Sequence, residues 1–278
     1  MLVKGKRKEL PREGYALHCQ DVYKKYGNRG ALCNIDLSVR SGEFCTIVGP
    51  SGCGKSTLLR LIVGQEQPTE GEITLKGEFI REPDPNRGIV YQKYSLYPHL
   101  TALENVILGK KLTAGFWGRI KQKQAFQDEA MFYLKRVNLA EHYDKYPHQL
   151  SGGMQQRVAI AQSLIMHPQI LLMDEPFGAL DPGTREAMQA LLIDLWEEYK
   201  MTFFFVTHDL EEAIYLGSRI IVLSQYYQDG EGKGTDCDHG ATIVADYPIE
   251  TGQATTIKNT KMFGNSWLQV LSKKNLSF

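Results

Sequence analysis

The feature that most constrains this chain is a glycine-rich segment at residues 49–57, which reads Gly-Pro-Ser-Gly-Cys-Gly-Lys-Ser-Thr. A short apolar run at residues 44–48 precedes it, and residues 55–63 carry apolar side chains in a helical pattern. This order predicts a strand, a tight loop and a helix. Loops of the form G-x-x-x-x-G-K-S/T in that context wrap around phosphate groups, so we expect the segment to bind a nucleotide.

Each part of this loop has an expected role. The glycines let several backbone N–H groups point at the phosphates, and the start of the helix adds a favourable field. Lys55 is expected to contact the β- and γ-phosphates, and Ser56 to ligate Mg²⁺. The alternative is a glycine turn that arises by chance. The predicted nucleotide-binding residues here are Gly49, Pro50, Ser51, Gly52, Cys53, Gly54, Lys55, Ser56 and Thr57.

A second apolar run, residues 170–173, ends in Asp174 and Glu175. The carboxyl end of a parallel strand beside a phosphate loop is where phosphate-loop enzymes hold their metal ion. We therefore expect Asp174 to hold Mg²⁺, directly or through water, and Glu175 to polarise the attacking water. His208 follows a third apolar run and could reach the γ-phosphate, although a lone histidine after a strand is more often structural.

The composition narrows the class of protein. Lys+Arg and Asp+Glu number 32 each, so no overall field attracts nucleic acid or anionic lipid, and no nucleic-acid partner is expected. No apolar run approaches the ~18–20 residues that span a bilayer. The N-terminus lacks the apolar stretch of a secretory signal. Five cysteines without a C-x-x-C pair favour free thiols. Together these features predict a soluble, cytosolic protein.

Strand-like runs alternate with helical patterns along most of the chain. The periodicity is helical between residues 101 and 150, and strand-like runs return at 170–173, 203–206 and 220–223. This alternation predicts right-handed crossovers and a mainly parallel sheet, which is an α/β fold. The apolar stripe between Met188 and Tyr199 has helical spacing and is interpreted as core.

Residues 150–157, Leu-Ser-Gly-Gly-Met-Gln-Gln-Arg, resemble the signature motif of ATP-binding cassettes, the ABC ATPases. The other motifs of that family occur in order. Tyr26 matches the aromatic residue that stacks on adenine, Gln92 the Q-loop glutamine, residues 179–181 the D-loop and His208 the switch histidine. The resemblance covers roughly residues 17–223, and the combination of motifs is highly specific.

The resemblance implies a fold and its division. It implies a P-loop NTPase (RecA-like) core, an antiparallel β subdomain and an α-helical signature subdomain at about residues 95–165. The cassette is expected at residues 15–224. Residues 1–14 are expected to be a polar tail, and residues 225–278 a loop insertion and tail of the cassette.

The resemblance also implies a dimer that clamps two ATP molecules head to tail. The signature residues of one chain then complete the ATP site of the other: Ser151, Gly152, Gly153 and Gln155. A serine and free N–H groups at the start of a helix suit an anion. The implied catalytic residues are Glu175, His208, Lys55 and Gln92. The implied metal ligands are Ser56, Gln92 and Asp174, and the implied cofactors are ATP and Mg²⁺.

Three kinds of ABC ATPase compete. Chromosome-type ATPases carry a long coiled coil between the phosphate loop and the signature, and no sustained heptads occur here. Translation-factor cassettes usually hold two nucleotide domains. The ATPase subunit of a membrane transporter fits best, and residues 174–181 and 207–213 resemble bacterial importers, in particular the nitrate/sulfonate/bicarbonate (taurine-type) group. A cytosolic ATPase acting on DNA or ribosomes, or an exporter subunit, remains the alternative.

An importer subunit implies partners and a location. The partners are an identical or paired ATPase subunit, transmembrane permease subunits and, indirectly, a solute-binding protein. The location is the cytoplasmic face of the inner membrane, and the solute a small oxyanion such as nitrate, sulfonate or bicarbonate. Tyr94, Leu96 and Tyr97 are plausible permease contacts, or simply core. Residues 225–239 depart from the group and are interpreted as a solvated insertion, rather than a metal site at residues 237–239.

Overall fold

The computed structural model describes residues 14–92, 96–225 and 240–249. The strands are β1 (Tyr15–Tyr26), β2 (Arg29–Arg40), β3 (Phe44–Val48), β4 (Glu70–Leu75), β5 (Glu78–Phe79), β6 (Arg87–Val90), β7 (Ile170–Asp174), β8 (Thr202–Thr207), β9 (Arg219–Ser224) and β10 (Thr242–Pro248). The α-helices are α1 (Lys55–Val63), α2 (Ala102–Thr113), α3 (Gly115–Lys121), α4 (Lys123–Arg136), α5 (Gly152–Leu164), α6 (Pro182–Tyr199) and α7 (Leu210–Leu216). Short 3₁₀ turns lie at Ala140–His142 and Pro147–Gln149.

The larger of two sheets has the strand order β10-β9-β3-β8-β7-β6. Strands β9, β3, β8, β7 and β6 pair in parallel, and β10 pairs with β9 in the antiparallel sense. The expected mainly parallel sheet is therefore confirmed. Strand β10 was not predicted, because residues after 224 show no clear alternation of apolar and polar side chains.

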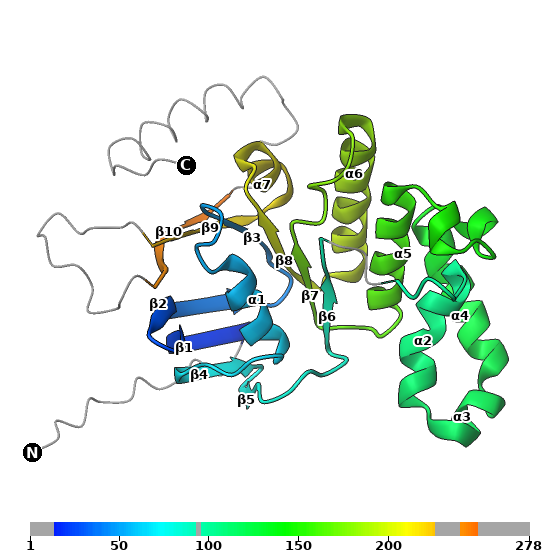
Figure 1. The fold of residues 1–278 in the computed structure, drawn as a ribbon, viewed down its shortest axis with the longest axis horizontal. Helices are drawn as coiled ribbons and strands as arrows, with labels where there is room; N and C mark the ends of the chain where they lie inside the picture. The colour runs from blue at the N-terminus through cyan, green and yellow to red at the C-terminus, as the bar shows by residue number, and fades with distance from the viewer. Residues whose placement is uncertain (1–13, 93–95, 226–239, 250–278) are drawn as a thin grey trace, which may run out of the picture.

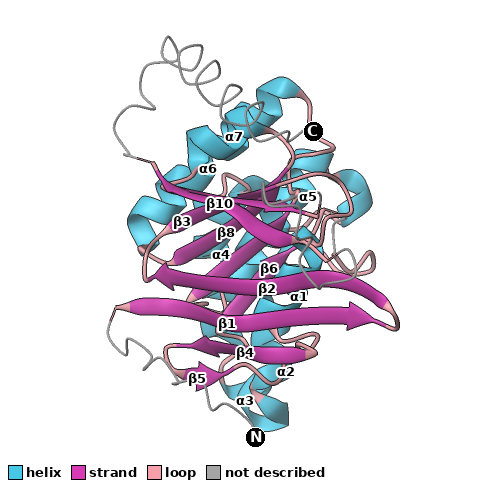
Figure 2. Ribbon diagram, turned by 90° about the vertical axis from the view of Figure 1, so that its left-hand side faces the viewer, coloured by secondary structure: helices cyan, strands magenta, loops and turns pink. Residues whose placement is uncertain are grey.

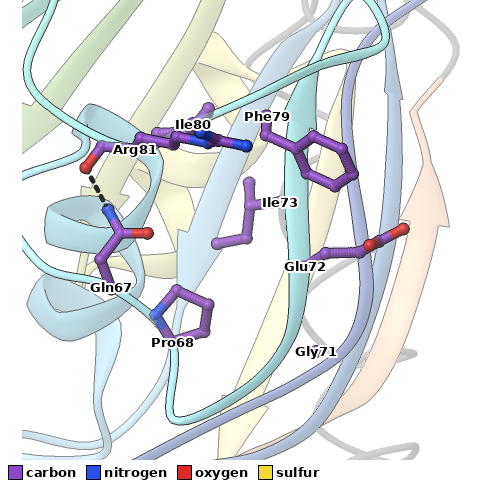
Figure 3. A pocket seen from close by; sticks show the side chains of 8 residues that line it. All are labelled: Gln67, Pro68, Gly71, Glu72, Ile73, Phe79, Ile80 and Arg81. Carbon is purple, nitrogen blue, oxygen red and sulfur yellow. Dashed lines mark hydrogen bonds between the residues drawn. The ribbon is translucent and has the colours of Figure 1, made fainter.

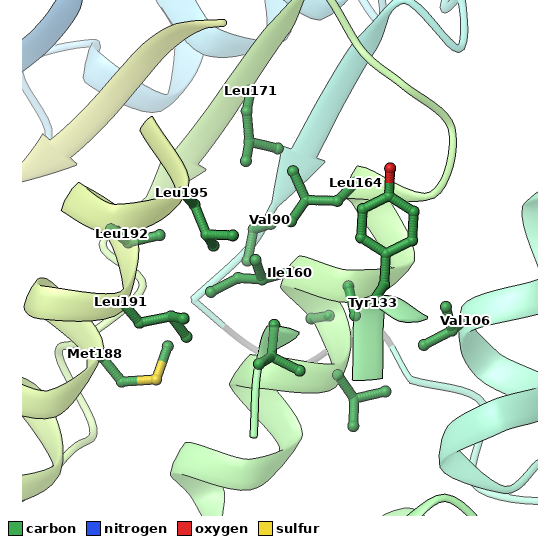
Figure 4. Packing of buried hydrophobic residues seen from close by; sticks show 14 of the residues in the cluster. Val90, Val106, Tyr133, Ile160, Leu164, Leu171, Met188, Leu191, Leu192 and Leu195 are labelled. Atoms are coloured by element: carbon green, nitrogen blue, oxygen red, sulfur yellow. The ribbon is translucent and has the colours of Figure 1, made fainter. Parts of the chain in front are cut away.

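The two faces of this sheet are covered by different layers. In β8, Phe203 and Phe205 belong to the cluster packed with α2, α4, α5 and α6, whereas Phe204 and Val206 belong to the cluster packed with α1 and the second sheet. Figure 4 shows the first cluster, where Leu191, Leu192 and Leu195 of α6 meet residues of α5. Burial on both faces explains why the parallel strands are continuous apolar runs in the sequence.

The second sheet is antiparallel, with the order β2-β1-β4-β5. Long strands β1 and β2 form a hairpin, and β4 pairs with the other edge of β1. Figure 2 shows this sheet below the parallel one, and Figure 1 shows helices α2, α3 and α4 gathered at the opposite end of the molecule. The antiparallel β layer and the helical layer that the resemblance implied are both present.

The cysteines follow the sequence expectation in part. Cys19, Cys45 and Cys53 are free and buried. Burial raises the pKa of Cys19 to about 12 and also raises that of Cys45, so both behave as small apolar side chains. Cys33 is disulfide-bonded, which corrects the expectation of free thiols at this position.

Several sequence interpretations fall outside the described residues. These are the polar tail at residues 1–13, Tyr94, the insertion at residues 226–239 with its rejected metal site, and the tail at residues 250–278. Tyr97 is described and is about half exposed, while Leu96 packs against the helical cluster. Among the described helices, none is both long and apolar enough to cross a bilayer.

Asn105 of α2 fixes the turn that leads into this helix. Its side chain is fully buried and accepts a hydrogen bond from Tyr97 N at 2.7 Å. Its amide donates to the carbonyls of Tyr97, Leu100 and Thr101 at 2.9–3.2 Å. One side chain therefore satisfies backbone groups over a whole turn.

We predict that Asn105→Ala lowers the free energy of unfolding by about 2–3 kcal/mol, because it leaves buried backbone groups without partners. Chemical denaturation measures the change. Gln124→Ala on the exposed face of α4 is the control, with an expected change of about 0.5 kcal/mol or less. Equal stabilities of the two variants would contradict the role given to Asn105.

Candidate nucleotide-binding site

Many of the predicted site residues lie at one edge of the parallel sheet. Strands β3, β8, β7 and β6 are neighbours, and their registers align Val48 with Thr207 and Asp174 with Val206. The carboxyl ends of these strands therefore lie side by side. The phosphate loop follows β3, His208 follows β8, Glu175 follows β7 and Gln92 follows β6. Segments that are far apart in the sequence are brought together by strand pairing alone.

The phosphate loop is a tight turn that closes on its own lysine. The Lys55 ammonium donates to the carbonyl oxygens of Gly49 at 2.7 Å and Pro50 at 3.0 Å. Lys55 is 5% exposed, so its charge lies inside the loop. Gly54, which begins α1, has a φ of 101°, and a Cβ there would lie 2.8 Å from Ala31 O. A glycine is thus required both for the backbone conformation and for contact with β2.

Cys53 points away from the cradle. Its side chain is 1% exposed, and burial raises its pKa. The backbone of residue 53 is bonded to Pro50 O at 3.3 Å. Cys53 therefore contributes its backbone to the loop, while its thiol packs into the core.

Asp174 and Ser56 form the first pair across the site. Burial raises the pKa of Asp174, and the charge of Glu175 acts in the same direction. The nearby Ser56 hydroxyl and the charges of Lys55 and Arg60 lower it. A hydroxyl and a carboxylate are hard oxygen donors, which are the ligands that suit Mg²⁺.

Mg²⁺ in phosphate-loop sites is held by few protein ligands and by phosphate oxygens. Within the described residues, no group of three or more His, Cys, Asp and Glu side chains is placed to hold a metal. The Ser56–Asp174 pair fits a metal that arrives with a nucleotide better than a closed, all-protein metal cage.

Glu175 and His208 form the second pair. The His208 Nδ1 lies 3.4 Å from Glu175 Oε2, and the histidine side chain is two-thirds exposed while that of Glu175 is 22% exposed. Glu175 has a φ of 45°, a left-handed conformation that costs a non-glycine residue about 1–3 kcal/mol. Its backbone N–H is bonded to Val206 O at 3.0 Å, which holds this turn against β8. Strain of this kind is concentrated at functional sites.

Gln92 reaches the turn after Glu175. A Cβ placed on Gly178 would lie 3.2 Å from the Gln92 amide nitrogen, so this side chain packs directly over Gly178. Gln92 is exposed, and its amide is free to turn toward a ligand at the same edge.

Tyr26 lies at the end of β1. Its ring is 46% exposed, and the Lys24 ammonium lies 5.1 Å from the ring centre. Its hydroxyl donates to Glu66 Oε2 at 2.5 Å. This hydrogen bond lowers the pKa of Glu66, and Lys24 and Arg60 add to the effect. The partly exposed ring is held in place and keeps one face available for stacking.

The signature residues begin helix α5. Ser151 is its N-cap, and its hydroxyl accepts from Met154 N at 3.3 Å. The Gln155 amide donates to Pro147 O at 2.9 Å and Leu150 O at 3.1 Å, so it fixes the preceding turn. A Cβ on Gly153 would lie 2.4 Å from Thr184 Cγ2, so this glycine lets α5 approach the start of α6.

Among the described residues, no hydrogen bond connects the signature residues with the phosphate loop of the same chain. The hydrogen bonds described for Ser151, Met154 and Gln155 are all local. The phosphate loop, Gln92, Asp174, Glu175 and His208 gather at the sheet edge, whereas Tyr26 lies on the antiparallel sheet. The first turn of α5 carries N–H groups that this edge does not use.

Two site features were missed by sequence reasoning. Glu66 is the hydrogen-bond partner of Tyr26, but 40 residues separate them in the chain. Gly178 makes room for Gln92, which is 86 positions earlier. Neither pairing leaves a local pattern in the sequence, so no local signal could have found it.

A groove of about 290 Å³ lies elsewhere, on the outer side of β4 and β5 (Figure 3). Ile73 lies at its floor, and the Gln67 amide donates to Arg81 O at 2.6 Å across one end. None of its lining residues belongs to the phosphate loop or to the strand ends described above. This groove is therefore separate from the candidate site.

Comparison with known proteins agrees with this geometry. The profile of the ABC transporter family matches residues 32–178. The nitrate import ATP-binding protein NrtD of Synechocystis sp. is 49% identical over 200 residues, which are 72% of this chain and 73% of that protein. The aliphatic sulfonates import ATP-binding protein SsuB of Bacillus anthracis is 43% identical over 202 residues, 73% of this chain and 77% of that protein.

A solved structure shares the fold. The dimeric structure of MJ0796, a bacterial ABC transporter cassette, superposes with a TM-score of 0.68 at 35% identity, covering 84% of this chain and 98% of that one. Because the profile spans more than half of the chain and relatives approach half identity, the chain belongs to the ABC transporter family and is one of its ATP-hydrolysing subunits.

Proposed function

We propose that this chain is the ATP-hydrolysing subunit of an importer that takes up a small oxyanion. One observation carries the ATPase part: the Ser56–Asp174 and Glu175–His208 pairs lie beside the phosphate loop at one sheet edge. The import part is supported by relatives whose names state import of nitrate and of aliphatic sulfonates. Nitrate and sulfonates are both oxyanions, so the proposal names that class of solute.

The residues of the phosphate loop bind and orient the nucleotide. Tyr26 presents its ring to the adenine, and the loop N–H groups and Lys55 surround the phosphates. Lys55 exchanges its bonds to Gly49 O and Pro50 O for phosphate oxygens. Ser56, Asp174 and Gln92 hold Mg²⁺, which when bound neutralises charge on the β- and γ-phosphates.

Glu175 and His208 act on the attacking water and on the γ-phosphate. Glu175 accepts a hydrogen bond from the water and orients it toward the γ-phosphorus, and His208 contacts the γ-phosphate. The 3.4 Å contact between the two side chains supports a joint role at one reacting group. Most of the acceleration then comes from positioning and from stabilising charge in the transition state.

The proposed functional unit is a pair of cassettes arranged head to tail. Ser151, Gly152, Gly153 and Gln155 of one chain complete the phosphate site of the other. The support is that α5 begins with a capped turn whose remaining N–H groups meet no anionic side chain in the described part of the chain. ATP between the chains favours the closed pair, and hydrolysis favours the open one.

The remaining partners follow from this function. The pair of cassettes docks on transmembrane permease subunits at the cytoplasmic face of the membrane, and a solute-binding protein acts through those subunits. The exposed ring of Tyr97 and the adjacent Leu96 form part of the docking surface. In this scheme the cassette extends over residues 15–224, with its helical subdomain at about residues 95–165.

We predict that Glu175→Gln binds ATP normally but hydrolyses it about 10²–10⁴ times more slowly, because the amide accepts a proton from water poorly. Phosphate release measures turnover, and fluorescence titration with a labelled nucleotide measures binding. Glu197→Gln on the exposed side of α6 serves as the control, with turnover like the wild type. Undiminished hydrolysis by Glu175→Gln would overturn the role of Glu175.

We predict that Lys55→Ala weakens nucleotide binding about 10- to 100-fold, because it removes a charge-assisted hydrogen bond to the phosphates. The same titration measures the change in Kd. Lys121→Ala, which removes an exposed charge from α3, leaves Kd unchanged. A Kd that is equal for the two variants would show that the loop does not hold phosphate through Lys55.

A further inference from the structure

Glu212 of α7 is a buried charged residue that the mechanism above does not use. Among the buried side chains of the described part of the chain, the two charged ones are Lys55 and Glu212. Lys55 lies in the phosphate loop. Glu212 is 7% exposed and lies four residues after His208. Burying a carboxylate is costly unless it is hydrogen-bonded, so its partners indicate what it does.

Its first partner holds the turn that carries His208. The Thr207 hydroxyl donates to Glu212 Oε2 at 2.6 Å and accepts from the backbone N–H of Asp209 at 3.0 Å. Asp209 in turn accepts from the N–H groups of residues 211 and 212 as the N-cap of α7. The residues on both sides of His208 are thus tied to one buried carboxyl group, while His208 itself projects outward.

Its second partner lies on α6. The Gln189 amide donates to Glu212 Oε1 at 3.2 Å. Helix α6 begins at Asp181, the last residue of the predicted D-loop, whose side chain caps it by accepting from Thr184 N at 3.0 Å. Arg185, one turn earlier than Gln189, donates to Leu180 O at 3.4 Å. The carboxyl group therefore links the His208 turn to helix α6, which directly follows the predicted D-loop at residues 179–181.

The surroundings of Glu212 shift its pKa in opposite directions. Burial raises the pKa of Glu212, and Asp209 acts in the same direction. The hydrogen bonds from Thr207 and Gln189, together with the charge of Arg185, lower it. Each oxygen of the carboxyl group has its own donor, so loss of the group leaves the buried Thr207 hydroxyl and the half-buried Gln189 amide, on different elements, without this partner.

We propose that Glu212 is a positioning residue that holds His208 in register with the start of α6. The inference rests on the proposed function, because it takes His208 as the group that contacts the γ-phosphate. Glu212 does not touch the nucleotide. It acts through the Thr207 hydroxyl on one side and through Gln189 on the other.

The test combines Glu212 and His208 variants. Glu212→Ala lowers kcat about 10- to 100-fold with an unchanged Kd for ATP, because His208 loses its fixed position. Glu212→Gln keeps an acceptor for Gln189, and its amide N–H₂ can donate to the Thr207 oxygen in place of the bond that the carboxylate accepts from it. The link between the two elements is therefore kept, and kcat returns to within about threefold of the wild type. Glu211→Ala removes an exposed carboxylate from the same helix and is the matched control.

A double-mutant cycle separates positioning from a general loss of structure. In a His208→Ala background, Glu212→Ala produces no further fall in kcat if it acts through His208. Losses that multiply would overturn the proposal, as would a Glu212→Ala variant with normal kcat. If His208→Ala alone has normal kcat, the proposed role of His208 fails instead, which distinguishes the two failures.

Gln189→Ala provides a second variant in case Glu212→Ala does not fold. Gln189 is half-buried, and Gln189→Ala removes the donor to Glu212 Oε1 while the Thr207 hydroxyl still donates to Oε2. The expected result is a smaller fall in kcat with an unchanged Kd, which again vanishes in the His208→Ala background. A Gln189→Ala variant that binds ATP less tightly and keeps kcat would contradict the proposal.

Discussion

The structure depends on the parallel pairing of β3, β8, β7 and β6. Strands β3, β8 and β7 are buried on both faces, so their side chains fix the register against two layers at once, and the edge strand β6 is partly buried. This register places the carboxyl ends of the strands next to each other. Strand pairing alone therefore brings together the phosphate loop, Asp174, Glu175, His208 and Gln92. A slip of one residue in β7 would exchange the faces of its side chains and remove Asp174 from Ser56.

Around this edge, hydrogen bonds hold individual side chains and turns in position. Lys55 closes the loop on Gly49 O and Pro50 O, and Tyr26 is anchored by Glu66. Glu175 is held in a left-handed conformation by its bond to Val206 O. These contacts hold the side chains of one half of the proposed catalytic site. The proposed other half, the capped first turn of α5, makes only local hydrogen bonds, and the proposed function therefore takes it from a second chain.

Much of this arrangement could be predicted from the sequence, because the informative residues directly follow buried strands. The apolar runs before residues 49, 174 and 207 predicted both the strands and their carboxyl ends. Parallel pairing of the strands then brings these ends together. What could not be predicted depends on contacts between distant positions. The bond from Tyr26 to Glu66, the link from Glu212 to Gln189 and the pairing of β10 with β9 all join segments whose local patterns are ordinary. The disulfide at Cys33 was missed because an odd number of scattered cysteines favours free thiols.

In the proposed dimer, a complete ATP site contains the phosphate loop of one chain and the signature of another. The most direct measurement mixes two inactive variants, Lys55→Ala and Ser151→Arg, and records ATP hydrolysis. A head-to-tail pair of unlike variants contains one intact site, so a one-to-one mixture is predicted to recover up to about a quarter of wild-type activity, since half of the pairs are mixed. A mixture that stays as inactive as its components would contradict the claim.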